Sequence, residues 1–187
     1  MRIVGGSHRG RRLAAPPGRG VRPTPERVRE ALFDILAHNP FATPPLPEGA
    51  RVLDAFAGSG ALGFEALSRG ARSVLFFETD TAARGALLAN ARTLGEEGRV
   101  RVLGRDATRP GPAPEAAGLA FLDAPYGRGL ADPALAALAE NGWLAPGAVV
   151  AVELSSREAL APPPGFTALD ARRYGTTRVV ILRFGAG

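Results

Sequence analysis

The sequence predicts an α/β fold in which a doubly wound, mostly parallel sheet carries a C-terminal antiparallel hairpin and an N-terminal basic arm. Short apolar runs alternate with helix-like segments from residue 51 onward, the pattern of parallel strands joined by right-handed crossovers. The last two apolar runs have no helix between them, as in a closing hairpin. Arginine is concentrated ahead of and within the first helix, and this segment forms the arm.

The elements follow one another in a regular order. Thr24 can cap a first helix that begins at Pro25, where the missing N–H of proline costs nothing, and apolar residues recur at helical spacing to Leu36. The other helices are expected at 60–69, 80–94 and 132–141. Strands are expected at 52–55, 74–78, 100–103, 119–123 and 149–154, and the hairpin strands at 166–172 and 178–184.

Length and composition predict one main domain with an appendage. With 187 residues, 45% of them hydrophobic, the chain can bury one sizeable core. We expect a basic arm and helix at 1–37, a proline-rich linker at 38–50 and the main domain at 51–187. No apolar run approaches the roughly 18 residues of a membrane span and no signal-peptide region opens the chain, so we expect a cytoplasmic protein without a membrane partner.

The chain contains no cysteine, which excludes several kinds of chemistry. It can form no disulfide, offer no thiolate to a metal and use no cysteine nucleophile. The covalent route by which pyrimidine C5 methylation normally proceeds is therefore excluded. The sequence also offers no cluster of metal ligands, and we expect no metal site.

The positive charge is located in one part of the chain. Residues 1–30 carry eight arginines against two acids, a net charge of +6, whereas the remaining 157 residues carry −1. Such an asymmetry indicates contact with a polyanion, although basic termini can also serve only as solubilising tails. The residues of the arm that we expect to contact nucleic acid are Arg9, Arg11, Arg12 and Arg22.

A glycine-rich turn after the first strand predicts a nucleotide-like ligand. In a doubly wound sheet, ligands bind beyond the carboxyl ends of the strands, where the strand order reverses. The turn of Gly58, Gly60 and Gly63 follows Asp54 there, and it matches the dinucleotide-binding spacing. Glu78, twenty residues after Gly58, could hold a ribose diol, so a nicotinamide cofactor remains an alternative.

Three features favour S-adenosylmethionine over a nicotinamide. The glycines begin four residues after Asp54, an acid that would repel pyrophosphate but attract an ammonium group. Asp106 follows the third strand and could accept a hydrogen bond from an adenine amine. A hydride-transfer enzyme has no evident use for the segment 123–126, whereas a methyl-transfer enzyme has. Each acid taken alone could equally be a cap or a surface charge.

That segment, Asp123-Ala124-Pro125-Tyr126, follows a buried strand and suits an exocyclic base amine. Such an amine is a poor nucleophile because its lone pair is delocalised into the ring. If Asp123 and the carbonyl of Ala124 accept its two hydrogens, the nitrogen can pyramidalise, and the carboxylate stabilises the charge that develops. Tyr126 offers a face for the base to stack on, so the base must be flipped out or unstacked.

These residues resemble those of N-methyltransferases with an (Asp/Asn/Ser)-Pro-Pro-(Tyr/Phe) motif, which have a Rossmann-like class I fold. Over nearly the whole length the chain is similar to the bacterial 16S rRNA guanine-N2 methyltransferase family, RsmD. The stretches that carry this resemblance are 1–6, 9–13, 21–24, 27–33, 56–71 and 141–144.

The resemblance implies methylation of the N2 amine of one guanine in 16S rRNA, within the small ribosomal subunit or an assembly intermediate, by a monomer. The residues 123–126 carry over as the catalytic motif, and the arm as the RNA-facing segment. The implied contacts of S-adenosylmethionine are Thr24, Asp54, Ala57, Gly58, Gly60, Glu78, Thr79, Asp106 and Ala107.

The chain departs from the family pattern at Ala124, where the motif usually has proline. The backbone carbonyl survives this change, and Pro125 still biases Ala124 toward an extended conformation. Alternatives that remain are an adenine-N6 methylase of DNA or RNA, a nicotinamide-dependent oxidoreductase, and an RNA-binding assembly factor without catalysis. Glu65, His8 and Asn90 receive no role from the sequence.

Overall fold

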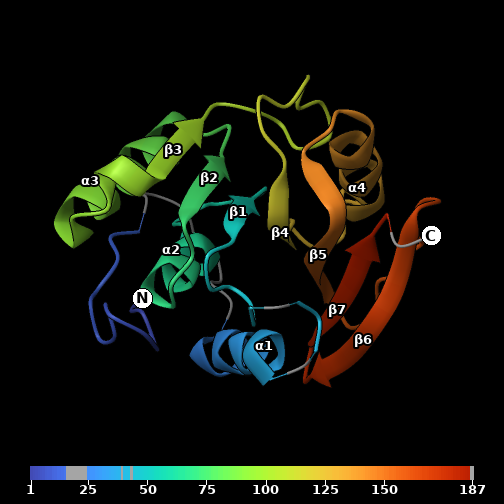
Figure 1. Cartoon of the computed structure of the whole chain (residues 1–187), viewed down its shortest axis with the longest axis horizontal. Coiled ribbons are helices and arrows are strands. Elements are labelled where there is room, and N and C mark those ends of the chain that lie inside the picture. Colours follow the sequence, from blue (N-terminus) through green and yellow to red (C-terminus); the bar gives the residue numbers. More distant parts are fainter. Residues whose placement is uncertain (16–24, 39, 43, 186–187) are drawn as a thin grey trace.

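The computed structural model describes residues 1–15, 25–38, 40–42 and 44–185. Its centre is a seven-stranded sheet in the order β3-β2-β1-β4-β5-β7-β6 (Figure 1). Strands β1 to β5 are parallel to one another, and β7 runs antiparallel to both β5 and β6. The strands are β1 Arg51–Asp54, β2 Ser73–Phe77, β3 Val100–Leu103, β4 Ala117–Asp123, β5 Leu144–Ser155, β6 Phe166–Tyr174 and β7 Thr177–Phe184. This confirms the predicted fold class.

Four α-helices and one short 3₁₀ helix accompany the sheet. They are α1 Glu26–His38, α2 Ala61–Ser68, α3 Thr81–Leu94, η1 Glu97–Arg99 and α4 Ala131–Glu140. The expected helices and strands all occur. The largest difference is at β5, which begins at Leu144 rather than at 149. Pro146 and Gly147 interrupt its apolar run, and the pairing with β4 shifts register at the corresponding point.

Hydrophobic cores lie on both faces of the sheet, because successive strand residues point to opposite sides. Val52 and Phe76 belong to the core shared with α1, α2 and α3, whereas Leu53 and Phe77 belong to the core shared with α4. Gly63 allows α2 to approach the sheet closely, since a Cβ there would lie 2.2 Å from the ring of Phe76. Close packing of α2 on the sheet therefore requires glycine at this position.

The first part of the arm is a small hairpin that packs on the main domain. Arg2 and Arg12 form an antiparallel bridge, and Leu13 donates a hydrogen bond to the carbonyl of Met1 at 3.0 Å. Ile3 and Leu13 are 1% and 5% exposed and lie in the same core as α1 and α2. Residues 1–13 and the sheet thus share one hydrophobic core.

Among the residues that the structure describes, no helix is both long and apolar enough to cross a membrane.

Candidate active site

The strand order reverses between β1 and β4, so these two strands define the switch point of the sheet. Asp54 at the end of β1 is paired in register with Phe121 of β4, two residues before Asp123. The amide of Ala55 donates to the carbonyl of Phe121 at 2.9 Å. We call the segment 123–126 the amine motif. The glycine turn and the amine motif therefore leave the same edge of the sheet side by side, although Asp54 and Asp123 are 69 residues apart in the sequence.

Asp54 has a buried carboxyl group that is hydrogen-bonded to the end of the glycine turn. It is 2% exposed, and its Oδ2 accepts a hydrogen bond from the amide of Gly63 at 3.1 Å. Burial raises the pKa of Asp54 to about 7, the nearby Glu78 adds to this, and the amides of Gly63 and Phe56 oppose it. This carboxyl group ties the end of β1 to the first turn of α2.

The glycines of the turn serve two different purposes. Gly58 has a φ of +53°, and a Cβ added there would meet nothing within 4 Å, so this side of the turn is open to a ligand. Gly60 has a φ of +80°, but its Cβ would lie 2.5 Å from Leu87 and 2.7 Å from Phe64. The requirement for glycine at position 60 therefore comes from the packing of the protein itself.

Glu78 is brought to the glycine turn, as the spacing suggested. It follows β2, is 9% exposed, and its Oε2 accepts from the amide of Gly58 at 2.9 Å. Its Oε1 accepts from the amide of Asp80 at 2.8 Å. The carboxylate is thus fixed in orientation at the rim of the open side of the turn.

The other cofactor candidates that the structure describes follow the carboxyl ends of β1, β2 and β3. Asp106 is exposed after β3, and its Oδ1 accepts from both the amide and the hydroxyl of Thr108 at 2.8 Å. Ala57 and Ala107 are buried, and Thr79 is exposed with its carbonyl accepting from Arg84 at 2.7 Å. Thr24 lies outside the described residues.

The amine motif forms the loop after β4. Ala124 is buried, whereas Pro125 and Tyr126 are exposed. The amide of Gly127 donates to Oε1 of Glu158 at 2.7 Å, and the other oxygen of that carboxylate accepts from Ser155 at 2.9 Å. The loop is thereby fastened to the end of β5.

The hydroxyl of Tyr126 is held by two residues of neighbouring strands. It donates to Oε1 of Glu153 on β5 at 2.7 Å and lies 3.3 Å from Oγ1 of Thr177 on β7. Burial raises the pKa of Tyr126 above its ordinary value; Glu153 adds to this, whereas the hydrogen bond with Thr177 opposes it. The phenol therefore stays protonated as a hydrogen-bond donor.

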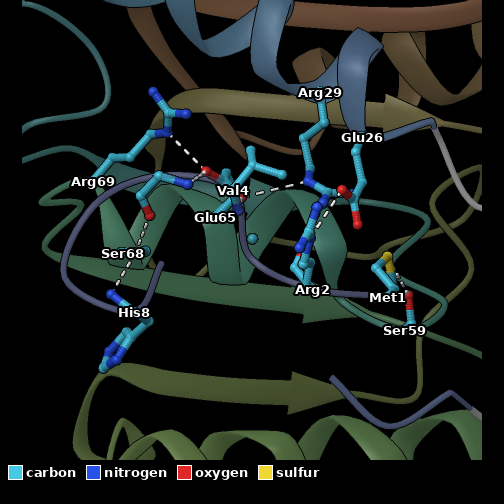
Figure 2. Close-up of polar contacts among 12 residues, drawn as sticks. Met1, Arg2, Val4, His8, Glu26, Arg29, Ser59, Glu65, Ser68 and Arg69 are labelled. Carbon is cyan, nitrogen blue, oxygen red and sulfur yellow. Dashed lines mark hydrogen bonds and ion pairs between the residues drawn. The ribbon is translucent and has the colours of Figure 1, made fainter. Parts of the chain in front are cut away.

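Glu65 fastens the hairpin of the arm to α2, a role that the sequence analysis missed. It is 0% exposed, and its two oxygens accept from the amides of Val4 and Gly5, each at 2.8 Å. Arg69 pairs with it at 2.8 Å and Arg29 of α1 at 3.4 Å. Figure 2 shows these contacts converging on one carboxylate between the arm, α1 and α2. The signal was an acid on the buried face of a short apolar helix.

Asn90 and His8 fasten the hairpin to α3 and its end. Asn90 is 2% exposed and exchanges two hydrogen bonds with the backbone of Ala14, at 2.8 and 3.0 Å. Its Nδ2 also reaches the carbonyl of Ser59 in the glycine turn at 3.4 Å, which connects the arm to the candidate cofactor site. His8 contacts Glu96 at 2.6 Å.

Glu96 is a strong acceptor for this contact. Burial raises the pKa of Glu96, but the hydrogen bonds from Arg99 and His8 outweigh burial and hold that pKa below its usual value.

The described arginines of the arm lie on the surface of the protein. Arg9, Arg11 and Arg12 are exposed on the hairpin, and Nη2 of Arg11 donates to the carbonyl of Thr93 at 2.5 Å. Arg22 lies outside the described residues. Within those residues, no three His, Asp or Glu side chains gather as a metal site would require.

Comparisons with known proteins identify relatives over nearly the whole chain. The family model described as "Conserved hypothetical protein 95" matches residues 1–183. "Ribosomal RNA small subunit methyltransferase D" of Escherichia coli (strain K12) is 41% identical over 168 residues, which cover 88% of this chain and 79% of the relative. The protein of the same name from Haemophilus influenzae is 37% identical, with 94% and 89% covered. The solved structure of yhhF from Escherichia coli superposes with a TM-score of 0.83 at 36% identity, with 100% and 99% covered.

Proposed function

Since this chain belongs to the ribosomal RNA small subunit methyltransferase D family, RsmD, we propose that it transfers a methyl group from S-adenosylmethionine to the N2 amine of a guanine in 16S rRNA. The named relatives support the coarser statement that this chain is an rRNA methyltransferase. We propose the finer points: the base, the position of the methyl group, the methyl donor and the residues that act. The substrate that we propose is the small ribosomal subunit or an assembly intermediate, and the enzyme acts as a monomer.

One observation carries the proposal: the amine motif leaves the sheet beside the glycine turn. The register of β1 with β4 places Asp54 opposite Phe121, and Asp123 follows two residues later. A methyl donor on the turn and an amine on the motif would meet above this pair of strands. An enzyme that moves hydride needs no hydrogen-bond acceptor at position 123, so this arrangement favours methyl transfer over a nicotinamide reaction.

The residues at the turn fit S-adenosylmethionine. Gly58 leaves open space where a ligand can approach the backbone, and Glu78 presents a carboxylate of fixed orientation at its rim. Asp106 and Thr79 are exposed after the neighbouring strands and can receive the adenosine part. When bound, S-adenosylmethionine supplies a methyl group made electrophilic by a positively charged sulfur.

The chain itself prepares the nucleophile. The carboxylate of Asp123 and the carbonyl of Ala124 accept the two amine hydrogens, which turns the nitrogen lone pair out of the plane of the base. The negative charge of Asp123 would stabilise the positive charge that grows on the nitrogen as its bond to the methyl carbon forms and the bond between that carbon and sulfur breaks, and the nitrogen would then release one proton to this carboxylate or to water. Most of the acceleration comes from holding the reacting atoms in line, which can supply roughly 7–11 kcal/mol. Tyr126 offers the exposed ring on which a flipped-out base stacks.

The test is methyl transfer from tritiated S-adenosylmethionine to 16S rRNA, small subunits and duplex DNA. We expect label in the subunits, and mass spectrometry of the digested rRNA should place it on the N2 position of one guanine. Label on adenine or on DNA would contradict the proposed base. Binding of NADH without binding of S-adenosylmethionine would favour an oxidoreductase, and RNA binding without transfer would favour an assembly factor.

A further inference from the structure

Tyr126 combines an exposed ring with a hydroxyl group that contacts buried residues; we call this contact the anchor of Tyr126. The residue is 44% exposed, yet its hydroxyl lies against Glu153 and Thr177, each 6% exposed. These partners come from β5 and β7, which lie 27 and 51 residues farther along the chain. The loop of the amine motif thus carries the ring, while two strands outside the motif fix where its tip lies.

Stability alone does not explain a carboxylate at position 153. The side chain is buried, and in register with β4 it stands beside Asp123, another acid. Removing a carboxylate from water costs several kcal/mol, and replacing a buried ionic group by apolar residues is often neutral or stabilising. The hydrogen bond to Tyr126 gives this acid a purpose that packing does not.

We propose that Glu153 is a positioning residue of the methyl transfer, whose carboxylate holds the ring of Tyr126 in the orientation on which the target base stacks beside Asp123. This inference rests on the proposed function. Without the anchor, the ring of an exposed loop residue turns about its side-chain bonds, and the stacked base turns with it. The amine then leaves its position next to Asp123. Because orientation of the reacting atoms supplies much of the rate, kcat falls.

A double-mutant cycle tests the inference. Glu153→Gln, Tyr126→Phe and the double variant are compared in methyl transfer to small subunits. Each single substitution is expected to lower kcat about tenfold, with the affinity for S-adenosylmethionine unchanged, because the glycine turn lies on other strands. The double variant is expected to be no slower than Tyr126→Phe alone, since Glu153 acts through the hydroxyl that this change removes.

Glu158→Gln is the matched control. The carboxylate of Glu158 holds the same loop, but through the amides of Gly127 and Ser155 rather than through a hydroxyl. Its effect on kcat should therefore add to that of Tyr126→Phe. If Glu153→Gln does not fold, Thr177→Val removes the second hydroxyl contact at similar shape, and its smaller loss should likewise vanish in the Tyr126→Phe background.

Gln at position 153 keeps a carbonyl oxygen that can still accept from the hydroxyl of Tyr126, so Glu153→Leu, which removes the acceptor, is measured beside it. A Glu153→Leu enzyme with the unchanged kcat would overturn the inference. So would a loss of equal size in both backgrounds, for Glu153→Gln or for Thr177→Val, which would mean a general structural role. Absence of methyl transfer by the unsubstituted chain would instead contradict the proposed function. The two failures are therefore distinguishable.

Discussion

Asp54 illustrates how one buried residue shapes the glycine turn. Its carboxyl group is buried under the glycine turn and receives the amide of Gly63. A carboxyl group held there gains little from ionisation, because burial removes it from water and Glu78 repels its charge. The residue consequently couples protonation to stability.

We expect the contribution of Asp54 to stability to fall as pH rises. Its pKa is about 7 in the folded protein against an ordinary value of 3.8, so the folded state holds a proton that the unfolded state releases between these two pH values. The contribution is full below pH 4 and declines by up to about 1.4 kcal/mol per pH unit toward pH 7. Urea unfolding of the unsubstituted chain and Asp54→Asn at pH 4, 5.5 and 7 measures it. A constant difference between the two would contradict the assignment.

At the amine motif, Asp123→Ala should nearly abolish catalysis. Loss of a group that stabilises developing charge costs roughly 100-fold or more in kcat. Ala124→Pro should be tolerated, because the backbone carbonyl remains and added rigidity changes the free energy by about 0.4–1 kcal/mol. Single-turnover methyl transfer compares the variants. Near-normal transfer by Asp123→Ala would rule out the proposed mechanism.

At the scale of elements, α2 can pack closely on β2 because Gly63 has no side chain. A Cβ at Gly63 would overlap the ring of Phe76, so Gly63→Ala must push the helix away from the sheet. Overpacking of this kind typically costs about 1–3 kcal/mol of unfolding free energy. At Gly85 on α3 an added Cβ meets nothing within 4 Å, so Gly85→Ala should raise the free energy of unfolding by about 0.5–1 kcal/mol. Chemical denaturation of both variants gives the comparison, and equal effects would contradict it.

The docking of the arm on α2 depends on the charge of Glu65. Glu65→Gln leaves Arg29 and Arg69 without their buried counter-charge, a kind of loss that typically costs about 3–5 kcal/mol. The amides of Val4 and Gly5 should then exchange with solvent faster, which hydrogen exchange with mass spectrometry detects. Glu26→Gln is the control, because the pair of Glu26 with Arg2 is exposed and such pairs contribute about 1 kcal/mol at most. Unchanged protection of Val4 would contradict the docking role.

The sequence was sufficient for the elements because strand and helix periods are local properties. Each expected strand was found. The start of β5 was predicted five residues too far along the chain, because Pro146 and Gly147 are typical of a turn but lie inside the strand. The convergence of Asp54 and Asp123 was also predictable, because parallel strands end at one edge. The buried role of Asp54 was not, since a side chain's partners depend on packing.

Long-range contacts escaped prediction for the same reason. Glu65 meets Val4 and Gly5 across about 60 residues, and Tyr126 meets Glu153 across 27. Periodicity contains no information on which polar group faces which across such separations. Three residues that the sequence left without a role, Glu65, His8 and Asn90, therefore proved to hold the arm.

Over the whole molecule, the basic arm and the sheet are separate parts of the chain that share one hydrophobic core. The +6 of residues 1–30 stands beside a main domain that is nearly neutral, so the electrostatic attraction of RNA should come from the arm. Arg9→Ala, Arg11→Ala and Arg12→Ala together should lower the slope of log affinity against log salt by roughly two. Arg172→Ala with Arg173→Ala on β6 is the control. Filter binding to 16S rRNA over a range of salt concentrations measures both, and equal slopes would contradict the role of the arm.

The anchor of the hairpin also has a consequence for biosynthesis. Val4 and Gly5 leave the translating ribosome early, but the carboxylate that receives their amides is about 60 residues behind them. At 5–20 residues per second this delay is about 3–12 s, and the basic segment stays undocked for that time. A docked arm consequently marks a chain whose first strand and second helix have already been made.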